Sequence, residues 1–176
     1  MAEPRGIPTN DHTDEGGPSC FVRADEIAAM PGLAKTHFLD PGARRLNRSL
    51  GDLTGLTGLG IHMIEVAPGD ATTAHHVHHS EDEAVYVLSG HATARIGDET
   101  HEIGPGDFLG YRKGGPAHSI RNTGTETLRC LVMGERRPSD ACDYPELGKR
   151  LYRHEGLPWT LVDHAAIDTP VAGRKA

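Results

Sequence analysis

The sequence predicts an all-β fold, and three features of the chain between residues 36 and 135 support this prediction. Short runs rich in β-branched and other apolar residues follow one another at regular spacing. Turn-forming residues such as Pro68-Gly69-Asp70 separate these runs, and Gly97-Asp98 between two alternating runs is typical of a tight hairpin. Many short strands of this kind favour a sandwich or barrel, with strands predicted at His37–Leu39, Arg45–Leu50, Leu59–Val66, Thr73–His78, Ala84–Leu88, Ala92–Ile96, Thr100–Ile103, Asp107–Tyr111, His118–Arg121 and Thr127–Met133.

The chain of 176 residues suits one domain with an extension at each end. Residues 1–17 are polar and rich in Pro, Gly, Asp and Thr, so we expect a flexible tail. Residues 18–135 form the predicted barrel domain, which starts with a short helical run at Ala24–Met30 that Pro31 ends. Residues 136–176 mix charged residues with scattered apolar side chains, and we expect them to pack on the barrel or on a partner subunit.

Charge and cysteine usage narrow the class of protein. The net charge of −7 would repel a polyanion, so we predict no nucleic-acid partner, and the basic cluster Arg44, Arg45 and Arg48 is interpreted as a solvated strand face. The N-terminus lacks an apolar signal core, and no run approaches the ~20 apolar residues that a spanning helix needs. The three cysteines cannot all pair within one chain, which favours reduced thiols. We therefore predict a cytoplasmic protein without a membrane partner.

The segment from Gly69 to Gly90 holds the strongest functional signal. Four of the twelve histidines fall within five positions there. Because side chains alternate along a strand, His76 and His78 would point together into the barrel while Val77 faces away. Two imidazoles at this spacing can bind one metal ion at roughly 2.0–2.2 Å each. The sequence thus predicts a metal site on this strand.

Two further residues complete the predicted ligand set. Glu83 heads the next predicted strand and shares its face with Val85 and Val87, while His118 comes from a strand far along the chain. Three neutral imidazoles and one carboxylate suit Fe, Mn, Zn or Ni and leave coordination positions open for a substrate. We predict one divalent transition metal per chain, held by His76, His78, Glu83 and His118.

These residues carry a resemblance to a known family. The segments H-x-H-x4-E-x6-G and G-x2-H-x3-N resemble the paired motifs of the cupin superfamily, over roughly residues 56–134. The departures from the family pattern, one extra residue after Gly69 and a displaced proline at Pro116, lie outside the ligand positions. The resemblance implies a cupin-type jelly-roll β-barrel with a metal inside, bound by His76, His78, Glu83 and His118. It also implies a homodimer.

The family hosts several chemistries, so two classes of function remain open. A small-molecule metalloenzyme of dioxygenase, isomerase or lyase type is the first, and a non-catalytic module that binds or senses a small molecule is the second. His75 and His79 are interpreted as surface residues, and Tyr111, Arg112 and Lys113 as residues at the barrel mouth that either bind an anionic substrate or decorate a turn. The remaining histidines, His37 and His62 among them, are interpreted as structural or exposed.

Overall fold

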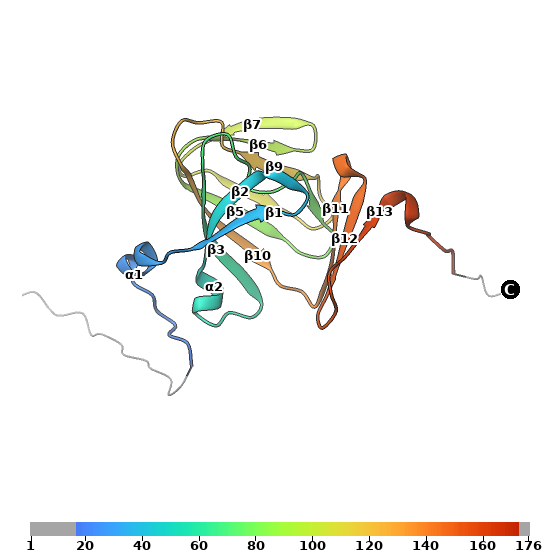
Figure 1. Ribbon diagram of the computed structural model, residues 1–176, viewed down its shortest axis with the longest axis horizontal. Helices are drawn as coiled ribbons and strands as arrows, with labels where there is room; N and C mark the ends of the chain where they lie inside the picture. Colours follow the sequence, from blue (N-terminus) through green and yellow to red (C-terminus); the bar gives the residue numbers. More distant parts are fainter. Residues whose placement is uncertain (1–16, 173–176) are drawn as a thin grey trace, which may run out of the picture.

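The computed structural model describes residues 17–172 of the chain (Figure 1). This part forms thirteen strands with a few single-turn or two-turn helices between them. In chain order the elements are α1 (Ala24–Ala29), β1 (Leu33–His37), β2 (Asp40–Ser49), α2 (Leu50–Leu53), β3 (Leu59–Val66), β4 (Val77–His78), β5 (Glu83–Ser89), β6 (Ala92–Ile96), β7 (Glu99–Ile103), β8 (Phe108–Tyr111), β9 (His118–Arg121), β10 (Leu128–Glu135), β11 (Ser139–Tyr144), η1 (Pro145–Leu147), β12 (Lys149–His154), β13 (Thr160–Asp163) and η2 (His164–Ala166).

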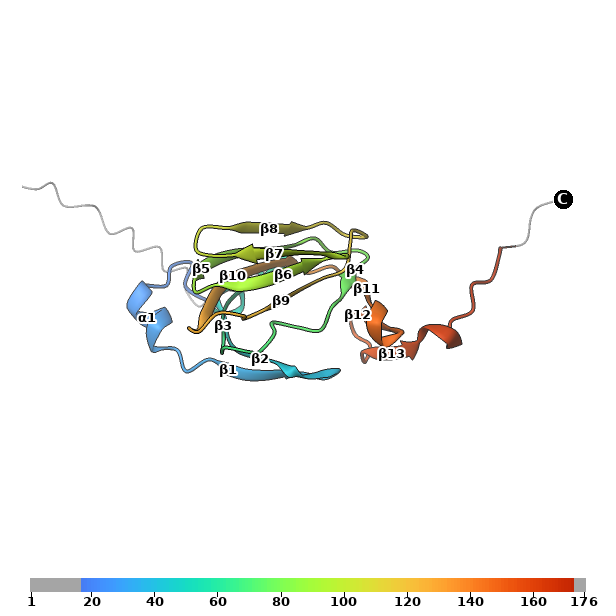
Figure 2. The ribbon, with the colours of Figure 1, turned by 90° about the horizontal axis from the view of Figure 1, so that it is seen from above.

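The described strands form three antiparallel sheets. A six-stranded sheet runs in the order β1-β2-β3-β10-β5-β8, and a three-stranded sheet in the order β7-β6-β9. The third sheet, β13-β12-β11-β4, gathers the C-terminal strands at one end of the molecule, as Figure 2 shows. Together these sheets form the jelly-roll barrel, and the prediction of an all-β fold is confirmed.

The core lies between the six-stranded and three-stranded sheets because alternate residues of each strand face inward. Val85 and Val87 of β5 are buried, whereas Tyr86 and Leu88 between and beyond them are exposed. One polar side chain, Asn122, is fully buried just after β9. Its Nδ2 donates to the carbonyl oxygens of Val66 and Glu126, each at 2.8 Å, and its Oδ1 accepts from the amide of Gly124. Asn122 therefore ties a loop to the sheet.

Most predicted strands within the barrel are present, and three of them, β3, β6 and β9, have the predicted bounds. The prediction at the first strand was wrong: β1 covers Leu33–His37 rather than His37–Leu39. The predicted strand Thr73–His78 shrinks to β4, with one isolated bridge from His76 to His118. This segment crosses from one sheet to another, so its backbone pairs with His118 on one side and with β11 on the other.

The ends of the chain differ from the sequence interpretation in detail. Residues 1–16 of the predicted tail lie outside the described part of the chain. Beyond residue 135 the expected extension is a three-stranded meander, β11 to β13, and β11 pairs with β4 of the barrel through Cys142 opposite His78. No helix within residues 17–172 has the length and apolar character needed to cross a membrane.

The basic cluster on β2 is not a solvated face, so that interpretation was wrong. Arg44 is exposed and pairs with Asp70 at 2.7 Å, but Arg48 is buried and pairs with Glu65 at 2.8 Å. Arg45 points to the other side of the strand and lines the internal cavity described below. The strand alternation that places Arg44 outside necessarily turns Arg45 inward.

The partly buried carboxylate of Asp143 on β11 accepts hydrogen bonds from several segments at the C-terminal sheet. It accepts two hydrogen bonds from Arg150 at 2.6 and 2.8 Å, one from His79 at 2.8 Å and one from His164 at 3.1 Å. The Arg150 guanidinium, with help from the two histidines, holds the pKa of Asp143 well below its usual range despite partial burial. The carboxylate thus connects β11 with β12 and with the segments after β4 and β13.

We expect Asp143→Asn to lower the melting temperature at pH 7 by roughly 2–8 °C, because it weakens charge-assisted hydrogen bonds. Since the folded-state pKa is depressed, this stabilisation is fully present above the unfolded pKa of 3.8, is smaller at pH 3, and is lost only as the pH falls through the much lower folded-state pKa. Thermal unfolding at pH 7 and pH 3 checks this. Asp163→Asn, which removes an exposed pair with Lys149, is the control with little effect. An equal loss for Asp143→Asn at both pH values would contradict the assignment.

Candidate metal centre

The structure brings the four predicted ligands to one cavity, although they come from separate elements. His78 lies on β4, Glu83 begins β5, and His118 begins β9. His76 precedes β4 and pairs with His118 through two backbone hydrogen bonds of 3.0 and 2.7 Å. This pairing sets the two imidazole rings 4.5 Å apart between centroids. Three strands and one bridge therefore fix where these side chains start.

The possible ligand atoms lie close together. Nε2 of His76 is 3.9 Å and Nε2 of His78 is 3.6 Å from a carboxylate oxygen of Glu83. One ligand atom each from His76, Glu83 and His118 lies within 4.8 Å of the other two. No such group in the described chain contains both His78 and His118. Glu83 is thus the carboxylate that the three imidazoles surround.

Hydrogen bonds at Nδ1 of two rings turn their Nε2 atoms toward Glu83. Nδ1 of His76 donates to the carbonyl oxygen of Ala74 at 2.9 Å, and Nδ1 of His78 donates to Asp140 at 2.6 Å. A neutral imidazole that carries its proton on Nδ1 presents a lone pair at Nε2. Such outer hydrogen bonds fix the tautomer and the ring orientation of metal-binding histidines.

His118 has an unusual environment for a buried imidazole. Within residues 17–172 neither of its ring nitrogens has a hydrogen-bond partner, and its exposed fraction is only 3%. The ring of Tyr111 stacks on it with centroids 3.6 Å apart. A buried polar atom without a partner is costly, and coordination of a metal by one nitrogen would remove part of that cost. The donor set and this unpaired ring both fit a transition metal.

The cavity next to these residues has a volume of about 640 Å³. That lies within the usual range of about 300–1,000 Å³ for small-molecule sites. Besides the predicted ligands, its walls include side chains from β1, β2 and β3 and from the C-terminal sheet, among them His37, Arg45, Tyr144 and Arg153. The C-terminal strands therefore form part of the site and not only a cover.

Comparison with known proteins identifies the family. A model of the cupin domain matches residues 62–134. The crystal structure of a putative sugar phosphate isomerase from Acidithiobacillus ferrooxidans is 50% identical, covers 87% of this chain and 97% of its own, and superposes with a TM-score of 0.84. The chain belongs to the cupin superfamily. A sugar phosphate isomerase of the same superfamily from Silicibacter pomeroyi, 21% identical, shares the fold with a TM-score of 0.71 over 80% of this chain and 90% of its own. None of the curated proteins matches the chain.

The charges at the centre of this cupin depend on one another. Burial opposes ionisation of Glu83, but the imidazoles of His76 and His78 outweigh it and hold the pKa of Glu83 well below its usual range. Burial also disfavours a proton on His78, yet Asp140 and Glu83 raise its pKa to about 9. Burial first, and His76 second, lower the pKa of His118 to about 3. These shifts favour an ionised Glu83, a neutral His118 and a second proton on the His78 ring at pH 7, and a bound metal would have to displace that second proton.

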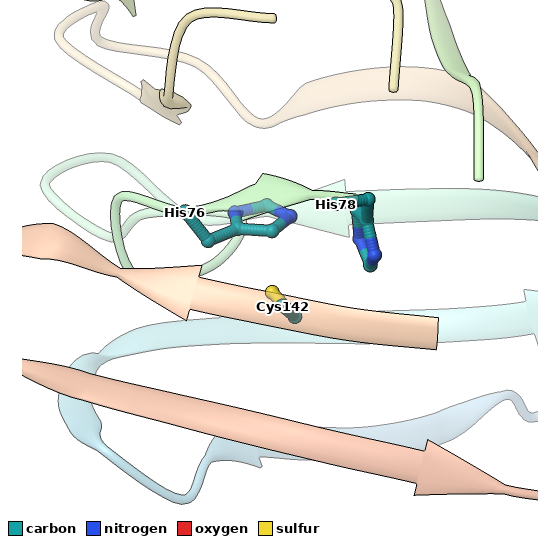
Figure 3. Close-up of side chains that lie close together, drawn as sticks. All are labelled: His76, His78 and Cys142. Atoms are coloured by element: carbon teal, nitrogen blue, oxygen red, sulfur yellow. The ribbon is translucent and has the colours of Figure 1, made fainter. Parts of the chain in front are cut away.

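Sequence reasoning missed several residues of the site. Sγ of Cys142 on β11 lies within 4.8 Å of ligand atoms of both His76 and His78, and Figure 3 shows the thiol beneath the two rings. Burial raises the pKa of this thiol to about 12, so it is protonated at pH 7. A lone cysteine in a segment interpreted as an extension carries no motif. Only the pairing of β11 with β4 places it here.

Asp140, two residues earlier on β11, was missed for the same reason. Its side chain is 1% exposed, and besides His78 it accepts a hydrogen bond from the amide of Ser80 at 2.9 Å. Arg153 of β12 lies 3.6 Å from it and also pairs with Glu81. This network connects His78 firmly to the C-terminal sheet.

The structure also shows where the histidines and polar residues lie whose roles could not be decided from the sequence. Nδ1 of His75 lies 3.2 Å from the hydroxyl of Ser119, and His79 is exposed and bonded to Asp143. Neither belongs to a candidate metal group of the described chain. Tyr111 is buried in the cavity wall, whereas Arg112 and Lys113 are exposed, so only Tyr111 lines the main cavity. His37 and His62, which were interpreted as structural or exposed, both line the cavity.

Proposed function

We propose that this cupin is a metal-dependent isomerase of phosphorylated sugars. The observation that carries the proposal is the convergence of three imidazoles and one carboxylate, from three separate segments of the chain, on a cavity of about 640 Å³. The reaction class comes from the likeness to the putative sugar phosphate isomerase, which is 50% identical over nearly all of its length. The cavity supplies the site, and the relative suggests the substrate.

The proposed metal is one divalent transition ion per chain, Fe, Mn, Zn or Ni, held by His76, His78, Glu83 and His118. Three features support this set: the Nε2 atoms of His76 and His78 beside Glu83, the His118 ring without hydrogen-bond partners in the described chain, and the ionised Glu83. Imidazole and carboxylate donors together suit these ions. When bound, the metal would polarise a carbonyl or hydroxyl oxygen of the substrate as a Lewis acid.

An isomerase must also move a proton, and His37 with Tyr144 are the residues we propose for this role. Nδ1 of His37 accepts a hydrogen bond from the amide of Leu39 at 3.2 Å, so the proton of the neutral ring lies on Nε2. Burial, with the charge of His76 and Arg45, lowers the pKa of His37 to about 4 and keeps the ring neutral at pH 7. Its Nε2 lies 3.4 Å from the Tyr144 hydroxyl, and both side chains line the cavity. The pair can exchange a proton with a substrate oxygen there.

A homodimer in the cytoplasm stays a prediction. The three free cysteines of the described chain, one exposed and two buried, are compatible with a reducing compartment. Sedimentation of the purified protein measures the oligomeric state directly.

To test this function, the protein is loaded with Mn, Zn, Ni or Fe(II) and incubated with a panel of aldose and ketose phosphates. NMR then measures whether any of these substrates is isomerised. We expect conversion of at least one substrate, abolished by a chelator and restored by the metal. If a sugar phosphate raises the melting temperature of the protein but is not converted with any of the metals, the protein is a binding module and not an enzyme. Oxygen consumption coupled to substrate loss would replace the isomerase by a dioxygenase.

A further inference from the structure

We infer that Arg45 and Lys35, assisted by His62, form a subsite that binds the phosphate group of the substrate on the β1–β2–β3 wall of the cavity. This inference rests on the proposed function, because the metal group on the same cavity would hold the oxygen-bearing carbon end. Arg45, Lys35 and His62 would thus select substrates that carry a phosphate group. They are different residues from the four proposed to bind the metal.

Arg45 is the main element of the subsite. It faces inward between Ala43 and Asn47 on β2, and its half-buried side chain lines the cavity. Within residues 17–172 it has no carboxylate within 4.0 Å and donates one hydrogen bond, to the carbonyl oxygen of Thr72. A guanidinium has five donors in a planar fork, so most of them remain for a ligand. Burial lowers the pKa of Arg45, which shows the cost of holding this charge without an anion.

Lys35 and His62 extend the positive wall around Arg45. Lys35 lies directly opposite Arg45 in the β1–β2 register, and it also forms no ion pair within the described chain. Nδ1 of His62 accepts a hydrogen bond from Nδ2 of Asn47 at 3.3 Å, so its Nε2 carries a proton that can be donated. Burial, and then the charge of Lys35, lower the pKa of His62. Lys35 and His62 both line the cavity beside Arg45.

Positive charge on this wall is not balanced locally. Arg136, the other cation beside His62, is neutralised by Asp52 at 2.5 Å, whereas Arg45 and Lys35 have no such partner among the described residues. Glu83 influences Arg45 from beyond 4.0 Å, and the proposed metal would take up that carboxylate. In a chain with net charge −7, two uncompensated cations facing a cavity indicate an anionic ligand.

Phosphate fits this arrangement better than a smaller or neutral group. A guanidinium fork recognises two oxygens of a phosphate at once, and an ammonium adds a point charge. Gly60 of β3 leaves the approach open, since a Cβ there would lie 3.2 Å from Nε of Arg136 and 3.3 Å from Nε2 of His62. The volume of about 640 Å³ accommodates the rest of a sugar phosphate beside the subsite.

The decisive comparison is between Arg45→Gln and its neighbour variant Arg44→Gln. Arg44 lies on the opposite face of β2 and pairs with Asp70, so it serves as a matched control. Titration calorimetry of inorganic phosphate into the metal-loaded proteins should show about a 10- to 100-fold weaker affinity for Arg45→Gln and an unchanged affinity for Arg44→Gln. Metal content should equal that of the wild type in both variants.

A second variant and a second pair of ligands provide measurements that do not depend on the folding of Arg45→Gln. Lys35→Met, at an exposed position that tolerates substitution, should weaken phosphate binding several-fold even if Arg45→Gln fails to fold. Fructose 6-phosphate should bind at least about tenfold more tightly than fructose, and Arg45→Gln should remove most of that difference. Equal phosphate affinity in wild type, Arg45→Gln and Lys35→Met would overturn the inference. Such a result with full metal content would leave the proposed metal chemistry standing.

Discussion

Replacing His76 with alanine is expected to remove the bound metal, whereas the wild type should carry about one metal ion per chain after purification and dialysis. His76 supplies Nε2 beside Glu83 and is 5% exposed, so its removal takes one donor out of a buried group. Elemental analysis of both proteins by mass spectrometry measures the effect.

The control for this experiment is the adjacent residue. His75→Ala removes an imidazole that bonds Ser119 and belongs to no candidate metal group of the described chain, and it should keep the metal. Cys142→Ala should also keep it, because the buried thiol is protonated at pH 7. Equal metal content in wild type and His76→Ala would refute the proposed ligand set. Loss of metal in Cys142→Ala alone would move the site toward the group formed by His76, His78 and Cys142.

The second large effect is expected from Asp140→Asn, which should weaken metal binding by about 10- to 100-fold. Asp140 accepts the Nδ1 proton of His78 at 2.6 Å, so the carboxylate fixes the ring with Nε2 toward Glu83. An asparagine of the same shape can turn its amide nitrogen toward His78 and lose this hydrogen bond. Isothermal titration of the metal into the apoprotein measures the affinity at several pH values.

The pH dependence gives this prediction a second readout. Burial disfavours a proton on His78, but Asp140 and Glu83 together raise its pKa to about 9, so below that pH a proton competes with the metal for the ring. Wild-type affinity should therefore fall as the pH is lowered from 9 toward 7. In Asp140→Asn the pKa of His78 should drop, so the fall should begin at lower pH. The affinities of the two proteins should therefore differ most near pH 9, where the proton competes least with the metal, and less near pH 7.

Asp143→Asn is the matched control for this second experiment. Asp143 lies on the same strand three residues later but bonds His79, Arg150 and His164 instead of His78. It should change stability without changing metal affinity. An Asp140→Asn protein that binds metal as tightly as the wild type, with the same pH profile, would show that the orientation of His78 does not depend on this carboxylate.

The barrel was predictable because its signals are local. Alternating apolar residues and turn residues between them predicted strands such as β3, β6 and β9 with correct bounds, and the same alternation placed Glu83 on the buried face with Val85 and Val87. The spacing of His76 and His78 likewise predicted that both side chains line one cavity. Each of these features depends on residues that are neighbours in the chain.

The rest of the site was not predictable, because it depends on contacts between distant segments. Arg45 was interpreted as a solvated residue because no local pattern indicates that β1 and β2 form a cavity wall. The C-terminal strands carried no regular alternation, so the roles of Asp140 and Cys142 appeared only with the pairing of β11 and β4.

The sequence by itself determined the all-β barrel, the family and a set of four candidate ligands, because strand periodicity and motif spacing are written in consecutive residues. Only the tertiary structure decided which side chains surround that set. These are the Asp140 carboxylate that bonds His78, the Cys142 thiol near the rings of His76 and His78, and the cations Lys35 and Arg45 on β1 and β2. Long-range strand pairing brings these groups together, and its register is fixed by the packing of the whole core rather than by any local pattern.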